Sequence, residues 1–247
     1  MAPTPRAVAM HDEVRSVVLR SRALLAPVSE LDLGSLERTF TIRCHDAIAA
    51  PLAAILVHRA NATAPLVSFR FVAEAPADTA DLGRGLVDLA IGSATSGPAD
   101  IVHEHVADDQ LVGLARRGNP HVDGVGDLEG FASAPHVIVS RRGRLEDAVD
   151  DALRALGRHR RVVASVASIA AALEIVRDSD VVATVPSSIA GRASADGALR
   201  SFPLPVDLPR VPVVLSWQRR LGSDVGHVWL RELVRDALGS MLADSSV

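Results

Sequence analysis

Residues 39–56 change from one hydrophobic pattern to another within a few positions. Phe40, Ile42 and Cys44 alternate with polar neighbours, which is the period of a β-strand with one buried face. After residue 46 the apolar positions recur every three or four residues, which is helical spacing. The pattern therefore predicts a strand followed directly by a helix, with Cys44, His45 and Asp46 at the turn.

Strands and helices alternate along the rest of the chain in two successive series. The first series predicts strands at 67–74, 87–92 and 110–117 and helices at 47–60 and 79–84. The second predicts strands at 136–140, 160–167, 181–186, 198–205 and 211–218 and helices at 145–156, 168–178 and 227–238. Two such series indicate two α/β lobes with a cleft between them. We expect residues 1–36 to form a linker, residues 37–112 and 213–247 lobe I, and residues 113–212 lobe II.

Residues 6–26 predict a separate helix with a narrow apolar seam. Met10, Val14, Val17 and Leu24 follow alternating steps of four and three residues, which is coiled-coil spacing. Such a seam needs a partner helix, so these residues predict dimerisation.

Composition narrows the class of protein. The chain has 247 residues, of which 48% are hydrophobic, so it can bury a substantial core. Its net charge is −4, so the composition does not indicate the positively charged surface with which a chain binds nucleic acid by itself. It has one cysteine, no long apolar run and no signal-peptide pattern, so we expect a soluble cytoplasmic protein.

The Cys-His-Asp turn allows three interpretations: a catalytic cluster, a metal site or the lip of a binding pocket. Consecutive side chains of a strand point to opposite faces, so neighbours rarely form a nucleophile–base line. Cys44 continues the apolar alternation and is expected in the core, whereas Asp46 is expected to cap the helix. His45 then faces the cleft, which favours the pocket lip.

No other stretch supplies a complete catalytic or metal site. His103-Glu104-His105 offers two histidines but no third ligand at zinc spacing. No segment matches a phosphate-binding loop, and no nucleophile, base and oxyanion donor occur together. We therefore expect no enzyme, no metal and no cofactor.

Several segments together resemble the LysR-type transcriptional regulators. TPRAVAMHDEVRSVVLRSRALL resembles their linker helix, and RTFTIRCHDAIAAPLAAIL the first strand and helix of their regulatory domain. LGRGLVDLAIG, VVATVPSSIA and LSWQRRLGSDVGHVWLREL resemble three later signatures, in the same order. The resemblance implies two Rossmann-like lobes of the type 2 periplasmic-binding-protein kind, preceded by an N-terminal linker helix. It also implies a homodimer or homotetramer and a small-molecule effector in the cleft.

The resemblance also implies DNA binding through an N-terminal winged helix-turn-helix. That domain is absent from this chain, so we interpret the chain as a regulatory region on its own or a truncated gene product. DNA binding then belongs to the intact protein.

The family's effector contacts the loop after the first strand, where serine or threonine is common. Cys44, His45, Asp46 and Ala47 occupy that loop here, which leaves His45 as the polar candidate. The remaining positions implied to face the cleft are Ser93, His136, Ile138, Ser140, Ser168, Pro186 and Ser187.

The helix starts after His45, Ser168 and Ser187 are expected to aim N–H groups at one space. They favour an anionic effector, such as an aromatic or other organic carboxylate. The alternative is that these serines only cap helices and the cleft holds water. Two other functions stay open: a solute-binding protein of a transporter, which needs a secretion signal, and a small hydrolase or transferase, which needs a catalytic constellation.

Overall fold

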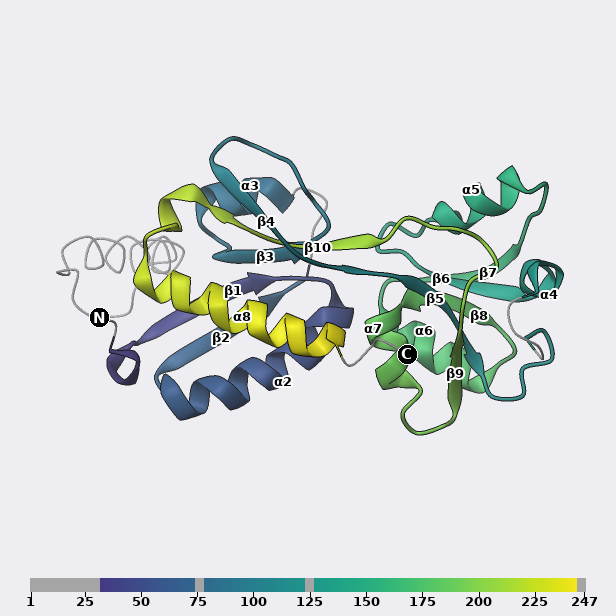
Figure 1. The fold of residues 1–247 in the computed structure, drawn as a ribbon, viewed down its shortest axis with the longest axis horizontal. Coiled ribbons are helices and arrows are strands. Elements are labelled where there is room, and N and C mark those ends of the chain that lie inside the picture. The colour runs from purple at the N-terminus through teal and green to yellow at the C-terminus, as the bar shows by residue number, and fades with distance from the viewer. Residues whose placement is uncertain (1–31, 74–77, 123–126, 244–247) are drawn as a thin grey trace, which may run out of the picture. The chain divides into compact units, whose positions relative to one another are not determined.

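A computed structural model describes residues 32–73, 78–122 and 127–243, and both of its β-sheets lie within the compact unit Gly34–Val247. Each sheet has five strands, and each belongs to one lobe (Figure 1). The predicted fold of two α/β lobes is therefore confirmed, and a single continuous sheet is excluded.

The sheet of lobe I has the strand order β2-β1-β3-β10-β4. β1 is parallel to β2 and to β3, whereas β10 is antiparallel to β3 and β4. The strands are β1 (Arg38–Arg43), β2 (Val67–Val72), β3 (Leu89–Gly92), β4 (Ile101–Asp109) and β10 (Val211–Gln218).

Helices cover both faces of this sheet. α2 (Asp46–Thr63) and α8 (Val225–Ala243) pack on the face that carries Phe40 and Ile42, whose side chains are fully buried. α3 (Asp78–Arg84) packs through Leu82 on the residues of a smaller cluster that includes Ala90. Gly85, with φ of 70°, ends α3 in the left-handed conformation that glycine adopts without strain.

The sheet of lobe II has the strand order β7-β6-β8-β5-β9. β6 is parallel to β7 and β8, whereas β5 is antiparallel to β8 and β9. The strands are β5 (Leu111–Arg116), β6 (Pro135–Val139), β7 (Arg161–Val166), β8 (Val182–Pro186) and β9 (Leu199–Phe202).

Two hydrophobic clusters hold the helices of lobe II on opposite faces of its sheet. α6 (Ile169–Asp178) and α7 (Ser187–Ala193) share a cluster with Val137 and Ala183. α4 (Leu128–Ser133) and α5 (Ala148–Ala155) share another with Val182 and Phe202. Short 3₁₀ helices lie at η1 (Leu33–Ser35) and η2 (Arg219–Leu221).

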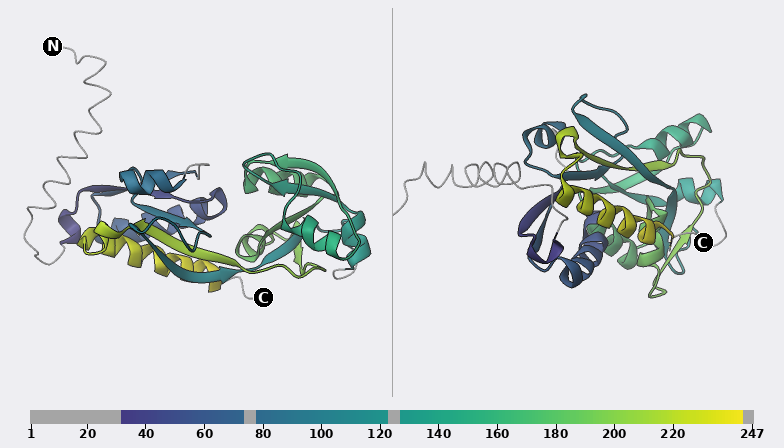
Figure 2. Two further views of the ribbon diagram at one scale, coloured as in Figure 1. Left: turned by 90° about the horizontal axis from the view of Figure 1, so that it is seen from above. Right: turned by 60° about the vertical axis from the view of Figure 1, so that its left-hand side comes forward.

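The chain passes between the sheets along β4 and β10. These strands pair antiparallel, with an irregularity between Val213 and Val214, and lie side by side in Figures 1 and 2. The sequence pattern predicted neither β4 nor α4. β4 lacks a clean alternation because its polar residues His103 and Glu104 are half-buried against other side chains, Ser216 and Arg235.

Candidate functional site

The turn between β1 and α2 is a helix start. His45 is the N-cap of α2, and its Nδ1 accepts a hydrogen bond of 3.2 Å from the Ala47 N–H. The same nitrogen lies 2.8 Å from Asp46 Oδ1. Asp46, which the sequence pattern predicted as the cap, is instead the first residue of the helix, so that prediction is wrong by one position. An N-cap residue needs an extended backbone. His45 has one because it continues the extended conformation of the preceding strand.

Asp46 reaches from lobe I to lobe II. Its Oδ2 accepts a hydrogen bond of 2.8 Å from the backbone N–H of Ile169, the first residue of α6. The next residue, Ala47, is 8% exposed and belongs to the hydrophobic cluster of lobe II. A carboxylate at a helix N-terminus is favourable because the first N–H groups have no partner within the helix. The predicted lip of lobe I therefore meets a predicted helix start of lobe II.

Cys44 is part of the core of lobe I. It is 1% exposed and packs in the same cluster as Phe40 and Ile42, as the alternation of β1 predicted. Its side chain lies on the same face as those of Phe40 and Ile42 because the side chains of a strand alternate between faces. We therefore leave Cys44 out of the proposed site.

Ser168 caps α6. Its backbone is extended, and its Oγ accepts a hydrogen bond of 3.2 Å from the Ala171 N–H. Among the described residues, the Ser168 hydroxyl accepts this hydrogen bond and donates none. Ser168 thus has the structural role of a cap and still carries one donor.

The start of α7 is bound by a carboxylate that the sequence pattern did not predict. Asp109, at the end of β4, is 7% exposed and accepts hydrogen bonds from Ser187 Oγ at 2.7 Å and Ser188 Oγ at 2.5 Å. It also accepts one of 2.8 Å from the Gln110 N–H. Pro186, which precedes α7, contributes no side-chain cap. Nothing near Asp109 in the sequence indicated this contact, because Ser187 and Ser188 follow almost eighty residues later.

His136 lies in the core of lobe II. Its side chain has no exposed surface, and its Nε2 donates a hydrogen bond of 2.8 Å to the carbonyl oxygen of Phe131. The ring also meets Phe131 edge-on, with centroids 4.7 Å apart. Burial lowers the pKa of His136 from 6.5 to about 4, and the positive charge of Arg160 acts in the same direction. The prediction that His136 faces a ligand is not compatible with this burial, so we leave it out of the proposed site.

The remaining predicted residues differ in exposure. Ile138 is 4% exposed, and Ser140, just after β6, is half-buried and accepts a hydrogen bond of 3.0 Å from the Arg144 N–H. Ser93, just after β3, is exposed. Ser93 and Ser140 follow strands and Ile138 lies near the end of one, but neither serine forms a side-chain hydrogen bond with the other lobe among the described residues.

Two hydroxyl groups beside Ile138 were missed by the sequence analysis. Ser165 on β7 is the registered neighbour of Ile138, and Thr184 on β8 follows Ala183, the neighbour of Val137. Neighbours across a sheet share a face, so both hydroxyls flank Ile138 near the carboxyl ends of the strands. Their oxygens are buried and have no hydrogen-bond partner among the described residues. Register between strands, which the sequence does not reveal, is what brings them together.

Two predictions concern other parts of the chain. The dimerisation residues Met10, Val14, Val17 and Leu24 lie outside the described residues. His103 contacts Ser216, and His105 contacts Asp108, at 2.9 and 2.8 Å. Within residues 32–73, 78–122 and 127–243, no group of three His, Cys, Asp or Glu side chains has the arrangement of a metal site.

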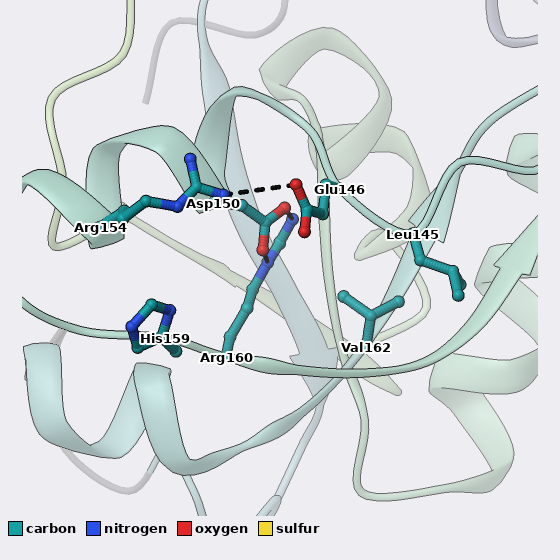
Figure 3. A pocket seen from close by; sticks show the side chains of 7 residues that line it. All are labelled: Leu145, Glu146, Asp150, Arg154, His159, Arg160 and Val162. Carbon is teal, nitrogen blue, oxygen red and sulfur yellow. Dashed lines mark hydrogen bonds and ion pairs between the residues drawn. The ribbon is translucent and has the colours of Figure 1, made fainter.

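A small hollow lies elsewhere on lobe II, at the start of α5 (Figure 3). Its volume is about 230 Å³, and its lining includes Asp150, Arg154 and Arg160. Arg160 donates to Asp150 at 2.7 and 3.0 Å, and Arg154 lies 3.3 Å from Glu146. Because these charges are paired within the protein, we assign no ligand to this hollow.

Comparison with known proteins identifies the family. The sequence model of the LysR substrate binding domain matches residues 33–239. The chain belongs to the LysR family of transcriptional regulators. It therefore contains the effector-binding domain of a LysR-type regulator, in a family that is not enzymatic.

Individual LysR-type relatives support this assignment. The chain is 29% identical to the HTH-type transcriptional activator NahR of Pseudomonas putida, over 96% of this chain and 79% of NahR. It is 27% identical to the HTH-type transcriptional regulator LinR of Sphingobium indicum, over 98% of this chain and 80% of LinR.

Solved LysR-type structures share the fold. The probable transcriptional regulator PA0477 from Pseudomonas aeruginosa superposes with a TM-score of 0.79 at 26% identity, over 96% of this chain and 78% of that one. The regulatory domain of MexT from Pseudomonas aeruginosa gives 0.72 at 24% identity, over 82% of this chain and 99% of that one. No helix among the described residues of this LysR-family chain has the length and apolarity to span a membrane.

Proposed function

We propose that this chain senses a small organic carboxylate between its two lobes and thereby controls transcription in the intact cytoplasmic regulator. DNA binding belongs to a winged helix-turn-helix of the intact protein. Dimerisation or tetramerisation uses the N-terminal seam Met10, Val14, Val17 and Leu24.

The observation that carries this proposal is the hydrogen bond between Asp46 and the Ile169 N–H. It joins the β1–α2 turn of lobe I to the start of α6 in lobe II, so one predicted polar residue of lobe I meets one predicted helix start of lobe II. It also places a carboxylate at a helix N-terminus. A ligand that alters this contact changes how the lobes are held together, and such a change is a signal that an attached DNA-binding domain can read.

The proposed site offers polar groups from both lobes. Lobe I contributes His45, and lobe II contributes the hydroxyls of Ser168, Ser165 and Thr184. Ile138 supplies apolar surface between the last two hydroxyls. Apolar walls with a few convergent polar groups are typical of small-molecule sites.

We expect Thr184→Val to weaken effector binding about fivefold to tenfold without lowering the stability of the free protein. The two side chains have the same shape, and the hydroxyl oxygen has no partner among the described residues of the free protein. A ligand hydrogen bond to that hydroxyl contributes about 1 kcal/mol. Calorimetric titration of wild type and variant with a carboxylate found by thermal-shift screening measures the effect.

The matched control is Thr63→Val, because Thr63 is exposed at the end of α2 and donates only to the Arg59 carbonyl oxygen. Equal affinities of wild type and Thr184→Val would remove Thr184 from the site. Effector-dependent gel shifts of the intact regulator test control of transcription separately, and no response to any ligand that binds this chain would contradict the proposal.

A further inference from the structure

Arg43 is buried at the end of β1, and one nitrogen of its guanidinium has no hydrogen-bonded partner among the described residues. The residue is 5% exposed, and its Nη1 is buried and bonded to none of the described residues. Among the described residues, the carboxylate oxygen paired with it is Asp81 Oδ2, which lies 4.0 Å from Nη1 and is too far for a hydrogen bond. A buried guanidinium without a close anion is unfavourable, because the charge has lost its water and gained little in return.

The other arginines with buried guanidinium groups in the described part of the chain are compensated. Arg160, whose side chain is fully buried, contacts the carboxylates of Asp147 and Asp150 at 2.8 and 2.7 Å (Figure 3 shows Asp150). Arg231 is 8% exposed, donates to the carbonyl oxygens of Leu221 and Gly222, and stacks 4.6 Å from the ring centroid of Trp217. The Nη1 of Arg160 also has no partner, but two anions balance its charge. Arg43 lacks both forms of compensation among the described residues.

The position of Arg43 is the topological switch point of lobe I. In the order β2-β1-β3, the chain leaves β1 through α2 on one face and reaches β3 through α3 on the other. Arg43 is registered with Val72 at the end of β2 and with Ala90 of β3. Ligands of open α/β sheets bind outside the carboxyl ends of strands at such a point. Arg43 is also two residues from His45, in the proposed site.

Two of the three helix starts that the sequence analysis expected to bind an anion already hold a carboxylate of the protein. Asp46 accepts from the first N–H of α6, and Asp109 accepts from the hydroxyls at the start of α7. A ligand carboxylate thus finds these two helix starts occupied by the protein's own carboxylates. Among the described residues at the carboxyl edge of lobe I, Arg43 is a charged donor without an anion in direct contact.

We propose that Arg43 binds the anionic group of the effector, through a guanidinium that pairs with a planar carboxylate. This inference rests on the proposed function and adds the residue that selects for charge. Without the effector, the anion closest to direct contact with Arg43 among the described residues is Asp81. The Asp81 side chain is 37% exposed, so only this side chain separates the guanidinium from solvent. A ligand carboxylate in direct contact forms the stronger, bidentate pair.

The test compares wild type with Arg43→Met, a neutral side chain of similar length, in thermal-shift and calorimetric titrations of the whole chain. The probes are benzoate, phenylacetate, 2-hydroxybenzoate and succinate, each beside its neutral amide. We expect at least one carboxylate, and not its amide, to stabilise wild type, and Arg43→Met to bind that carboxylate at least about tenfold more weakly. Arg43→Lys keeps the positive charge but lacks the planar guanidinium that can donate two parallel hydrogen bonds to a carboxylate. It is expected to retain part of the affinity.

Two further variants make the result specific. Arg70→Met removes an exposed arginine from neighbouring β2 and should leave the affinity unchanged. Asp81→Asn removes the distant anion and should strengthen carboxylate binding severalfold, an effect that a purely structural Arg43 does not produce. Without ligand, Arg43→Met should melt at the same temperature as wild type or higher, since it removes an uncompensated buried charge.

Each outcome separates this inference from the proposed function. If Arg43→Met binds the carboxylate as tightly as wild type, Arg43 is not the anchor, although the proposed function stands. A markedly lower melting temperature of ligand-free Arg43→Met, or unchanged affinity in Asp81→Asn, also overturns the inference. If no carboxylate of the panel stabilises wild type, both this inference and the anionic effector are wrong.

Discussion

Replacing Asp109 with alanine is expected to lower the free energy of unfolding by about 3 kcal/mol. The carboxylate is 7% exposed and accepts three hydrogen bonds, from Ser187 Oγ, Ser188 Oγ and the Gln110 N–H. Without it, the hydroxyl of Ser188, a residue that is 7% exposed, loses its acceptor in a place that water reaches poorly. Urea denaturation followed by circular dichroism measures the loss.

The neighbouring Asp108 provides a matched control. It is exposed and pairs with the exposed His105, so Asp108→Ala should change the unfolding free energy by less than about 0.5 kcal/mol. Asp109→Asn keeps an acceptor for one serine and should fall between the two. If Asp109→Ala were as stable as Asp108→Ala, the carboxylate would not anchor the start of α7.

Acid should destabilise the protein through His136 by about 3 kcal/mol when complete. Burial lowers the pKa of His136 to about 4 in the folded state, against 6.5 for an exposed histidine. Between these two values the unfolded chain binds the proton and the folded protein does not. The neutral histidine therefore contributes its full stability above pH 6.5, and this contribution is lost as the pH falls to about 4. Burial also lowers the pKa of His227, which adds a loss of the same sign.

His136→Gln isolates this effect. The glutamine amide can donate to the Phe131 carbonyl oxygen as His136 Nε2 does, but it does not titrate. Between pH 7 and pH 5, wild type should lose about 2 kcal/mol more unfolding free energy than the variant. Denaturation midpoints across this range provide the measurement, and parallel curves for the two proteins would show that His136 is not held neutral by the fold.

The sequence by itself determined the elements that depend on local chemistry. The alternation of Phe40, Ile42 and Cys44 predicted β1 and the burial of the cysteine, because side chains of a strand alternate between faces. Ser168 signalled the start of α6, since its hydroxyl accepts a hydrogen bond from the backbone N–H of Ala171, only three residues later in the sequence. The two strand–helix series predicted two lobes, which the two sheets confirm. β4 was missed because its polar residues, such as Glu104, are accommodated by partners on distant elements.

Only the tertiary structure decided which polar groups already have partners. Asp46 reaches Ile169 and Asp109 reaches Ser187 across long stretches of sequence, so no local pattern reveals that these carboxylates fill the helix starts. His136 follows the same strand alternation as a cleft residue, yet packing against Phe131 buries it. The isolation of Arg43 is likewise a property of the fold. A charged residue in the sequence carries no mark of whether the assembled protein provides an anion, because that depends on the distances between elements that folding brings together.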